Sequence, residues 1–154
     1  MLDVSYKNAI LKDLNFILET EKNCFNSIDY FKRHQVYHFL KNPNNSIITD
    51  IIMIKDLPIG WACYFTRKKQ NFLRLYSICI LPQFSGKGYG KEYLQKRIKE
   101  FLKDFSKIIL EVRASNKKAI RLYESIGFKK KKILPGYYID EDGIKMIYTF
   151  PKTS

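Results

Sequence analysis

A loop at residues 82–90 carries three glycines at alternate positions and joins an apolar, strand-like stretch to a stretch with helical spacing. The strand-like stretch is Phe72 to Leu81, and the helical one runs from Tyr89 to Phe105. Glycines let several backbone N–H groups approach one anion, and a helix N-terminus adds about half a positive charge. The loop therefore predicts a cradle for a phosphate or pyrophosphate, although a plain tight turn would also use glycines.

Two common phosphate-binding motifs do not fit this loop. A Walker A loop has the pattern G-x-x-x-x-G-K-[ST], whereas Gly86 to Lys91 is one residue short and Glu92 stands in place of Ser or Thr. A dinucleotide-binding fingerprint needs G-x-G-x-x-G, which glycines at 86, 88 and 90 do not match. The loop alone therefore leaves the identity of the ligand open.

The hydropathy pattern predicts a single mixed α/β domain over residues 1–154. Three apolar, β-branched stretches separated by turns precede the glycine loop and predict an antiparallel meander. A helix, a short apolar strand of the buried parallel type, a second helix and two closing strands follow the loop. The expected strands are 4–9, 47–54, 60–67, 72–81, 108–112, 128–134 and 145–150, and the expected helices are 11–24, 29–40 (with Asp29 as N-cap), 89–105 and 116–126.

Charge is distributed unevenly along the chain. Residues 1–60 hold seven Lys or Arg and seven Asp or Glu, whereas residues 61–154 hold 21 and eight, and so carry the whole net charge of +13. Such a field attracts polyanions, which include a phosphorylated cofactor, RNA or an acidic protein surface. A lysine-rich, solubilising surface would give the same composition. The run Lys129 to Lys132 could contact a phosphate, but it fits protection of an edge strand better.

The cysteines, the histidines and the N-terminus narrow the class of protein. Cys24, Cys63 and Cys79 are far apart, which argues against a disulfide framework and against a cysteine zinc site. His34 and His38 have the spacing of two helical zinc ligands, but no third ligand is evident, so no metal is expected. Charges interrupt the first 16 residues, unlike a signal peptide, and no apolar stretch is long enough to span a membrane. We therefore expect a cytoplasmic protein that does not contact a membrane.

A second motif lies downstream of the glycine loop, where residues 110–128 read LEVRASNKKAIRLYESIGF. Together with ILPQFSGKGYG at 80–90, it resembles the GCN5-related N-acetyltransferase (GNAT) superfamily, and most of all the RimI-type ribosomal-protein alanine N-acetyltransferases. The resemblance implies a single-domain GNAT fold, with a mixed, mostly antiparallel sheet of about six to seven strands flanked by about four helices. It also implies that an amine attacks the thioester of acetyl-CoA directly.

The resemblance assigns acetyl-CoA to the glycine loop and to the strand before it. Backbone groups of Ile78, Cys79 and Ile80 are expected to meet the acetyl carbonyl and the pantetheine amides, in a strand that carries a bulge. Asn116 is expected to bond the pantetheine arm, and it could also cap the helix that follows. The residues expected around the pyrophosphate are Ser85, Gly86, Lys87, Gly88, Tyr89, Gly90 and Lys91. Ser85 departs from the superfamily pattern, which has a long polar residue there.

Two residues of the second motif have chemistry suited to acetyl transfer. Glu111 resembles the general base of the RimI-type enzymes and would act through water; alternatively it could pair with Arg113 or a nearby lysine. Tyr123 follows Asn116 by two helical turns, which places both on one helix face. It resembles the general acid that protonates the departing thiolate, and a core tyrosine with a satisfied hydroxyl would give the same pattern.

The acceptor is less constrained. By similarity, Tyr137 and Tyr138 line the acceptor groove from a loop; alternatively, they simply cover the core. The acidic segment that follows these tyrosines in RimI-type enzymes is shortened here, at 139–145. A protein N-terminal α-amine, ribosomal or other, is favoured because at pH 7 roughly one α-amine in ten is neutral, against roughly one lysine in 2,500. A small-molecule amine and a lysine side chain remain alternatives. An RNA- or polyanion-binding module is the non-enzymatic alternative, but no nucleic-acid motif is present, so direct nucleic-acid binding is not expected.

Overall fold

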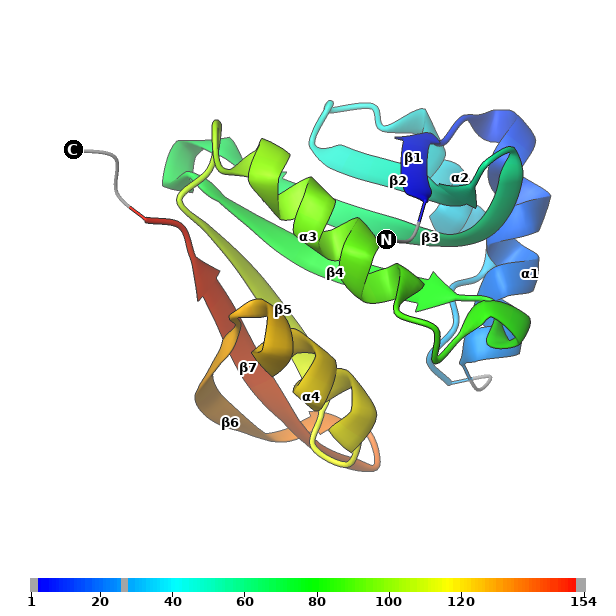
Figure 1. The fold of residues 1–154 in the computed structure, drawn as a ribbon. Helices are drawn as coiled ribbons and strands as arrows, with labels where there is room; N and C mark the ends of the chain where they lie inside the picture. Colours follow the sequence, from blue (N-terminus) through cyan, green and yellow to red (C-terminus); the bar gives the residue numbers. More distant parts are fainter. Residues whose placement is uncertain (1–2, 26–27, 152–154) are drawn as a thin grey trace.

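The computed structural model describes residues 3–25 and 28–151, which form a seven-stranded sheet with helices on both faces (Figure 1). The strands are β1 (Val4–Asn8), β2 (Ile47–Ile54), β3 (Leu57–Arg67), β4 (Phe72–Ile80), β5 (Lys107–Arg113), β6 (Lys129–Tyr138) and β7 (Glu141–Thr149). The helices are α1 (Leu14–Cys24), α2 (Arg33–Lys41), α3 (Tyr89–Phe101) and α4 (Lys117–Ile126), with single 3-10 turns at Leu11–Asp13, Lys68–Gln70 and Pro82–Phe84. The predicted fold class is confirmed.

The sheet has the order β1-β2-β3-β4-β5-β7-β6, and every neighbouring pair is antiparallel except β4 with β5. β4 and β5 pair only over residues 72–74 and 107–109, after which they separate. The four-stranded and three-stranded parts of the sheet therefore diverge towards the C-terminal ends of these two strands (Figure 1). This divergence leaves a gap between the C-terminal parts of β4 and β5.

Alternating side chains build one apolar core on each face of the sheet. α3 and α4 cover one face, where Leu94 and Ile120 pack, whereas α1 and α2 cover the other, where Ile17 packs. Ile51 and Ile52 are neighbours in β2 but belong to different cores, because successive strand residues point to opposite faces. No helix within residues 3–25 and 28–151 is long and apolar enough to cross a membrane.

A buried polar network fixes α3, the helix that follows the glycine loop, to the sheet. The carboxylate of Asp50 in β2 accepts hydrogen bonds from the Tyr93 hydroxyl and from Arg97 Nε, the latter at 2.8 Å. The hydroxyls of Tyr64 and Tyr93 lie 2.8 Å apart. Burial raises the pKa of Asp50 above its ordinary value, against the opposing effect of the Arg97 charge. The first turn of α3 is therefore held in place by contacts that start one turn further along the helix.

The beginning of α2 differs from the prediction. α2 begins at Arg33 with Lys32 as its N-cap, so the prediction that Asp29 caps this helix is wrong. The physical reason is a stronger partner: both carboxylate oxygens of Asp29 accept hydrogen bonds from the guanidinium of Arg113, at 2.7 and 3.0 Å. A contact 84 positions away in the sequence thus replaces a local cap.

Other boundaries also differ from the prediction: β3 begins at Leu57 rather than residue 60, and β7 begins at Glu141 rather than residue 145. α3 ends at Phe101, and the residues up to Phe105 form turns. Tyr137 and Tyr138 lie at the end of β6 rather than in a loop, because the pairing with β7 resumes at Tyr138 after an irregular stretch that contains Gly136 at φ +62°. β6 forms an edge of the sheet and exposes Lys129 to Lys132, as predicted for edge-strand protection.

Candidate active site

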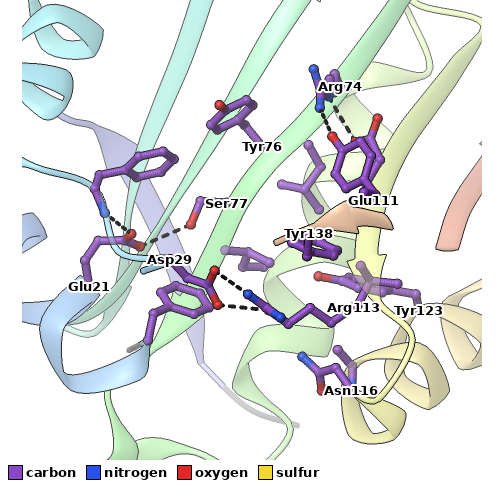
Figure 2. A pocket seen from close by; sticks show the side chains of 17 residues that line it. Glu21, Asp29, Arg74, Tyr76, Ser77, Glu111, Arg113, Asn116, Tyr123 and Tyr138 are labelled. Atoms are coloured by element: carbon purple, nitrogen blue, oxygen red, sulfur yellow. Dashed lines mark hydrogen bonds and ion pairs between the residues drawn. The ribbon is translucent and has the colours of Figure 1, made fainter. Parts of the chain in front are cut away.

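A cavity of about 360 Å³ occupies the gap where β4 and β5 separate (Figure 2). Asn116 and Tyr123 line it from α4, on one face of the sheet, while Phe31 and Tyr76 line it from the face that α1 and α2 cover. A single space therefore connects the two faces of the sheet between the diverging strands.

The gap coincides with a β-bulge in β4. Leu75 pairs with Tyr64 and Ser77 pairs with Cys63, so Tyr76 is an extra residue without a partner in β3. A bulge bends its strand and increases the local twist, which turns the end of β4 away from β5. The bulge that the resemblance implied in this strand is thus present, two residues before Ile78.

The last residues of β4 direct their main chain alternately towards β3 and away from it. Cys79 pairs with Trp61, and its carbonyl oxygen would lie only 2.3 Å from a Cβ atom on Gly60, so the backbone of Cys79 faces β3. Because alternate residues of a strand direct their N–H and C=O groups to opposite sides, the backbone groups of Ile78 and Ile80 point away from β3, and the Ile80 carbonyl accepts a hydrogen bond from the Cys24 thiol at 3.2 Å. Among the three residues predicted to offer backbone groups here, Ile78 lines the cavity and directs its main chain away from β3, whereas the main chain of Cys79 faces β3.

The glycine loop has the open geometry expected of an anion cradle. Gly86 and Gly88 have φ angles of +76° and +87°, and a Cβ atom on Gly86 would meet nothing within 4 Å. Gly88 is the N-cap of α3, whose first-turn N–H groups have no partner inside the helix. The Ser85 hydroxyl donates to the carbonyl of Pro82 at 2.9 Å, so it bonds within the loop. The remaining residues predicted for the cradle complete the loop and the first turn, namely Lys87, Tyr89, Gly90 and Lys91.

Asn116 and Tyr123 lie on the side of α4 that faces the cavity, as their spacing predicted (Figure 2). The Oδ1 atom of Asn116 accepts a hydrogen bond from the amide of Ala119 at 3.1 Å, so Asn116 caps α4. Burial raises the pKa of the Tyr123 phenol above its ordinary value, and the nearby Tyr138 and Cys79 add to this effect. Tyr123 therefore keeps its proton at neutral pH and can donate it to a group in the cavity.

Glu111 takes part in an ion pair with Arg74, a partner that the sequence did not suggest. The Nε atom of Arg74 lies 3.0 Å from Glu111 Oε2, and its Nη2 atom donates to the Tyr137 hydroxyl at 2.7 Å. Glu111 and Arg113 lie on the same side of β5, as predicted, but Arg113 makes its ion pairs with Asp29 and the turn between β6 and β7. The suggested alternative pair of Glu111 with Arg113 is therefore replaced by the pair with Arg74.

Arg113 connects the two segments that border the cavity on its α1–α2 side. Besides Asp29, its guanidinium contacts Asp140 at 2.6 Å and Glu141 at 3.3 Å, and it lies 4.5 Å above the Tyr138 ring. Burial is the main cause that raises the pKa of Tyr138, to about 12. Arg113 thus joins the segment after α1 to the β6–β7 hairpin beside the cavity, and its bonds to Asp29 are drawn in Figure 2.

Glu21 lines the cavity and is almost completely buried, with 1% of its surface exposed. Its carboxylate accepts hydrogen bonds from Trp61 Nε1 at 2.9 Å, Ser77 Oγ at 3.1 Å and the Phe31 amide at 3.1 Å. Burial raises the pKa of Glu21, and these donors oppose that rise. Glu21 therefore ties α1 to β3, to β4 directly after its bulge, and to the segment before α2.

Comparison with known proteins identifies the family. Residues 12–128 match the model of the acetyltransferase (GNAT) family. The chain belongs to the GNAT family. It is 29% identical over 157 residues to the N-alpha-acetyltransferase of Saccharolobus solfataricus, an alignment that covers 94% of this chain and 92% of that protein. It is 41% identical over 70 residues to the [ribosomal protein bS18]-alanine N-acetyltransferase of Escherichia coli K12, which covers 45% of this chain and 47% of that one.

The fold supports the same assignment. The crystal structure of the ribosomal-protein-S18-alanine N-acetyltransferase from Escherichia coli superimposes with a TM-score of 0.85, at 23% identity, over 98% of this chain and 96% of that chain. Together these similarities establish an N-acetyltransferase of the GNAT family, with a RimI-like fold. The mostly antiparallel seven-stranded sheet and the glycine loop before α3 are the features of this chain that match the predicted GNAT architecture.

Three charged residues that line the cavity, Glu21, Asp29 and Arg74, were not predicted from the sequence as site residues. Arg74 is a charged residue inside a mostly apolar strand, and Glu21 is an acidic residue on the inward face of α1. Both residues are exceptions to the apolar pattern around them, and such exceptions could have indicated a functional role. Asp29 did not stand out in the same way, because an aspartate just before a predicted helix is expected there as an N-cap. His34 and His38 are exposed on α2, and no group of three or more His, Cys, Asp or Glu side chains in the described part of the chain is placed to hold a metal ion.

Proposed function

We propose that this GNAT enzyme transfers the acetyl group of acetyl-CoA to the N-terminal α-amine of proteins. The observation that carries the proposal is the cavity between β4 and β5, because one space reaches Tyr123 on one face of the sheet and Glu111 and Tyr137 on the other. A thioester approaching from the α4 face and an amine approaching from the α1–α2 face can meet there. The name of the Saccharolobus relative, which aligns along nearly the whole chain, supports this acceptor class.

Acetyl-CoA fits the groups on the α4 face. The open loop around Gly86 and Gly88, the N-terminus of α3 and the nearby Lys87 suit a pyrophosphate. The main chain of Ile78, a residue that lines the cavity, points away from β3 and offers hydrogen bonds to a pantetheine arm and an acetyl carbonyl. The donor would therefore lie between β4 and α4, with its thioester near Tyr123.

The transfer step uses two proton movements. The neutral amine attacks the carbonyl carbon of the thioester, the C–N bond forms and the C–S bond breaks. Tyr123 gives its proton to the departing thiolate, and Glu111 receives the proton that the amine loses, through water. Both residues line the cavity, and the raised pKa of Tyr123 keeps its phenol protonated until that moment.

Mass spectrometry of acetylated peptides tests the acceptor class. A peptide library that includes ribosomal-protein N-termini is incubated with enzyme and acetyl-CoA, with each peptide present in a free and an N-terminally blocked form. We expect a mass increase of one acetyl group only on free N-termini. Acetylation that persists on the blocked peptides would instead indicate lysine side chains as acceptors, and modification of simple amines alone would indicate a small-molecule acceptor.

Replacing Gly88 by valine is expected to weaken acetyl-CoA binding at least about tenfold. A side chain at φ +87° costs about 1–3 kcal/mol of backbone strain, and relief of that strain reorients the amides of the cradle. Isothermal titration calorimetry with acetyl-CoA measures the effect. Gly136→Val is the matched control, because Gly136 also has a positive φ, of +62°, but lies in β6. Unaltered affinity in Gly88→Val would place the cradle elsewhere.

The pH profile distinguishes the two kinds of protein amine. For an α-amine acceptor, kcat/KM should rise with pH through a midpoint near pH 8, where about half of such amines are neutral, and level off near pH 9. Because burial raises the pKa of Tyr123, the required acid stays protonated, so no fall in rate is expected below pH 10. A rate that continues to rise towards pH 10.4 would favour a lysine acceptor. A rate that falls between pH 8 and 9 would exclude Tyr123 as the acid.

A further inference from the structure

Arg74 occupies the point at which the sheet divides. It is the last residue of β4 to pair with β5, opposite Ile109, and the gap begins directly after it. Its guanidinium contacts Glu111 of β5 at 3.0 Å and the hydroxyl of Tyr137 in β6 at 2.7 Å. It also lies 5.3 Å from the centre of the ring of Tyr76, the bulged residue. One side chain therefore links three strands at the edge of the cavity (Figure 2).

The guanidinium geometry fixes its two partners relative to each other. A guanidinium is planar and rigid, so bonds from Nε and Nη2 hold Glu111 and Tyr137 in one frame, which a flexible lysine could not do. The side chains of Arg74 and Glu111 are only 31% and 16% exposed, so solvent screens this pair less than a surface ion pair. The cavity wall thus has a defined arrangement before any acceptor binds.

The direction of each hydrogen bond follows from the chemistry of arginine. Arginine only donates, so the Tyr137 oxygen accepts from Nη2 and the hydroxyl proton of Tyr137 remains available as a donor. The carboxylate of Glu111, in contrast, only accepts. The cavity therefore presents an acceptor group for an amine and, beside it, a donor group for a carbonyl. An N-terminal residue carries this same pair, because its α-amine is followed by the carbonyl of its first peptide bond.

We propose that Arg74 is a positioning residue that holds Glu111 and Tyr137 in register, so that the site selects amines with a neighbouring carbonyl over plain amines. This inference rests on the proposed function and adds the chemical basis of acceptor choice. In it, Glu111 handles the proton of the amine while Tyr137 donates to the first carbonyl, and Arg74 touches neither part of the acceptor.

The test compares two acceptors in four variants. One acceptor is an alanyl peptide, and the other is the same peptide with a methylene ether in place of its first amide, which removes the carbonyl. Arg74→Met should lower kcat/KM for the peptide about tenfold, with a smaller loss for the ether analogue, so that selectivity falls.

Tyr137→Phe should raise KM for the peptide with little change in kcat. Adding Tyr137→Phe to Arg74→Met should change KM little further, because Tyr137 has already lost its orientation. Arg74→Lys should restore kcat but not KM, since a lysine holds one partner and not both.

Controls separate positioning from loss of the fold. Arg67→Met removes an exposed arginine at the far end of β3 and should leave both acceptors unaffected. Acetyl-CoA affinity should be unchanged in every variant, and each variant should still melt in one cooperative transition, which shows that it is folded. An equal loss for both acceptors in Arg74→Met, or full activity, would overturn the inference while leaving the proposed function intact. If the wild-type enzyme acetylates no free N-terminal peptide at all, the proposed function itself fails.

Discussion

Replacing Tyr123 by phenylalanine is expected to lower kcat about 100-fold while the affinity for acetyl-CoA stays unchanged, because the variant loses only the proton donor for the thiolate. The side chain lines the cavity from α4 and is 9% exposed, so phenylalanine fills the same space. Burial raises the pKa of the phenol, which keeps the proton available over the working range of pH. Steady-state kinetics together with calorimetry measure the two quantities separately.

Tyr148→Phe is the matched control for this experiment. Tyr148 packs 5.5 Å from the ring of Phe128, which is also the neighbour of Tyr123, but Tyr148 belongs to β7 and does not line the cavity. Its loss should leave kcat unchanged. If Tyr123→Phe turns over at the wild-type rate, Tyr123 is a core aromatic residue and another group protonates the thiolate.

Replacing Asp50 by alanine is expected to destabilise the fold by about 3–5 kcal/mol, because it leaves a buried charge without its partner. The side chains of Asp50 and Arg97 are 3% and 15% exposed, and the Tyr93 hydroxyl would also lose its acceptor. Acetyl-CoA binding should also weaken, because these contacts hold α3 in place and thereby the glycine loop that precedes it. Urea denaturation measures the loss of stability, and calorimetry measures the weaker binding of acetyl-CoA.

Glu100 provides an internal comparison for Asp50. It contacts the same guanidinium, at 3.3 Å from Arg97 Nη1, but its side chain is 59% exposed. Exposed pairs contribute about 0–1 kcal/mol, so Glu100→Ala should cost little. Equal costs for the two substitutions would mean that burial of Asp50 does not determine the strength of this contact.

The features that could be predicted from the sequence are those that local spacing encodes. Apolar, β-branched stretches between turns placed β2 and β4, and helical periodicity placed α4. The glycine loop predicted the first residue of α3 correctly. Asn116 and Tyr123 face the cavity together because seven residues are two helical turns, and this relation needs no tertiary information. The GNAT resemblance rested on the same two local motifs, which is why the family could be identified without a structure.

The contacts that organise the α1–α2 side of the cavity could not be predicted, because each joins residues that are far apart in the sequence. Arg74 lies 37 positions from Glu111, and Asp29 lies 84 positions from Arg113. The local sequence of a strand or a turn does not indicate such partners, because they become neighbours only when the sheet forms. Glu21 was visible as an acidic residue on an apolar helix face, but its partners come from three other segments. The α1–α2 side of the cavity is thus organised by tertiary contacts, whereas the glycine loop and the cavity-facing side of α4 follow from local sequence.

A crystal structure with a conjugate of coenzyme A and an alanyl peptide tests the central claim most directly. The account predicts the pyrophosphate on the amides of residues 86–90, the pantetheine arm between the separated ends of β4 and β5, and the peptide on the side of Tyr137 and Arg113. A conjugate bound elsewhere, with its peptide and its pantetheine arm on the same face of the sheet, would contradict it.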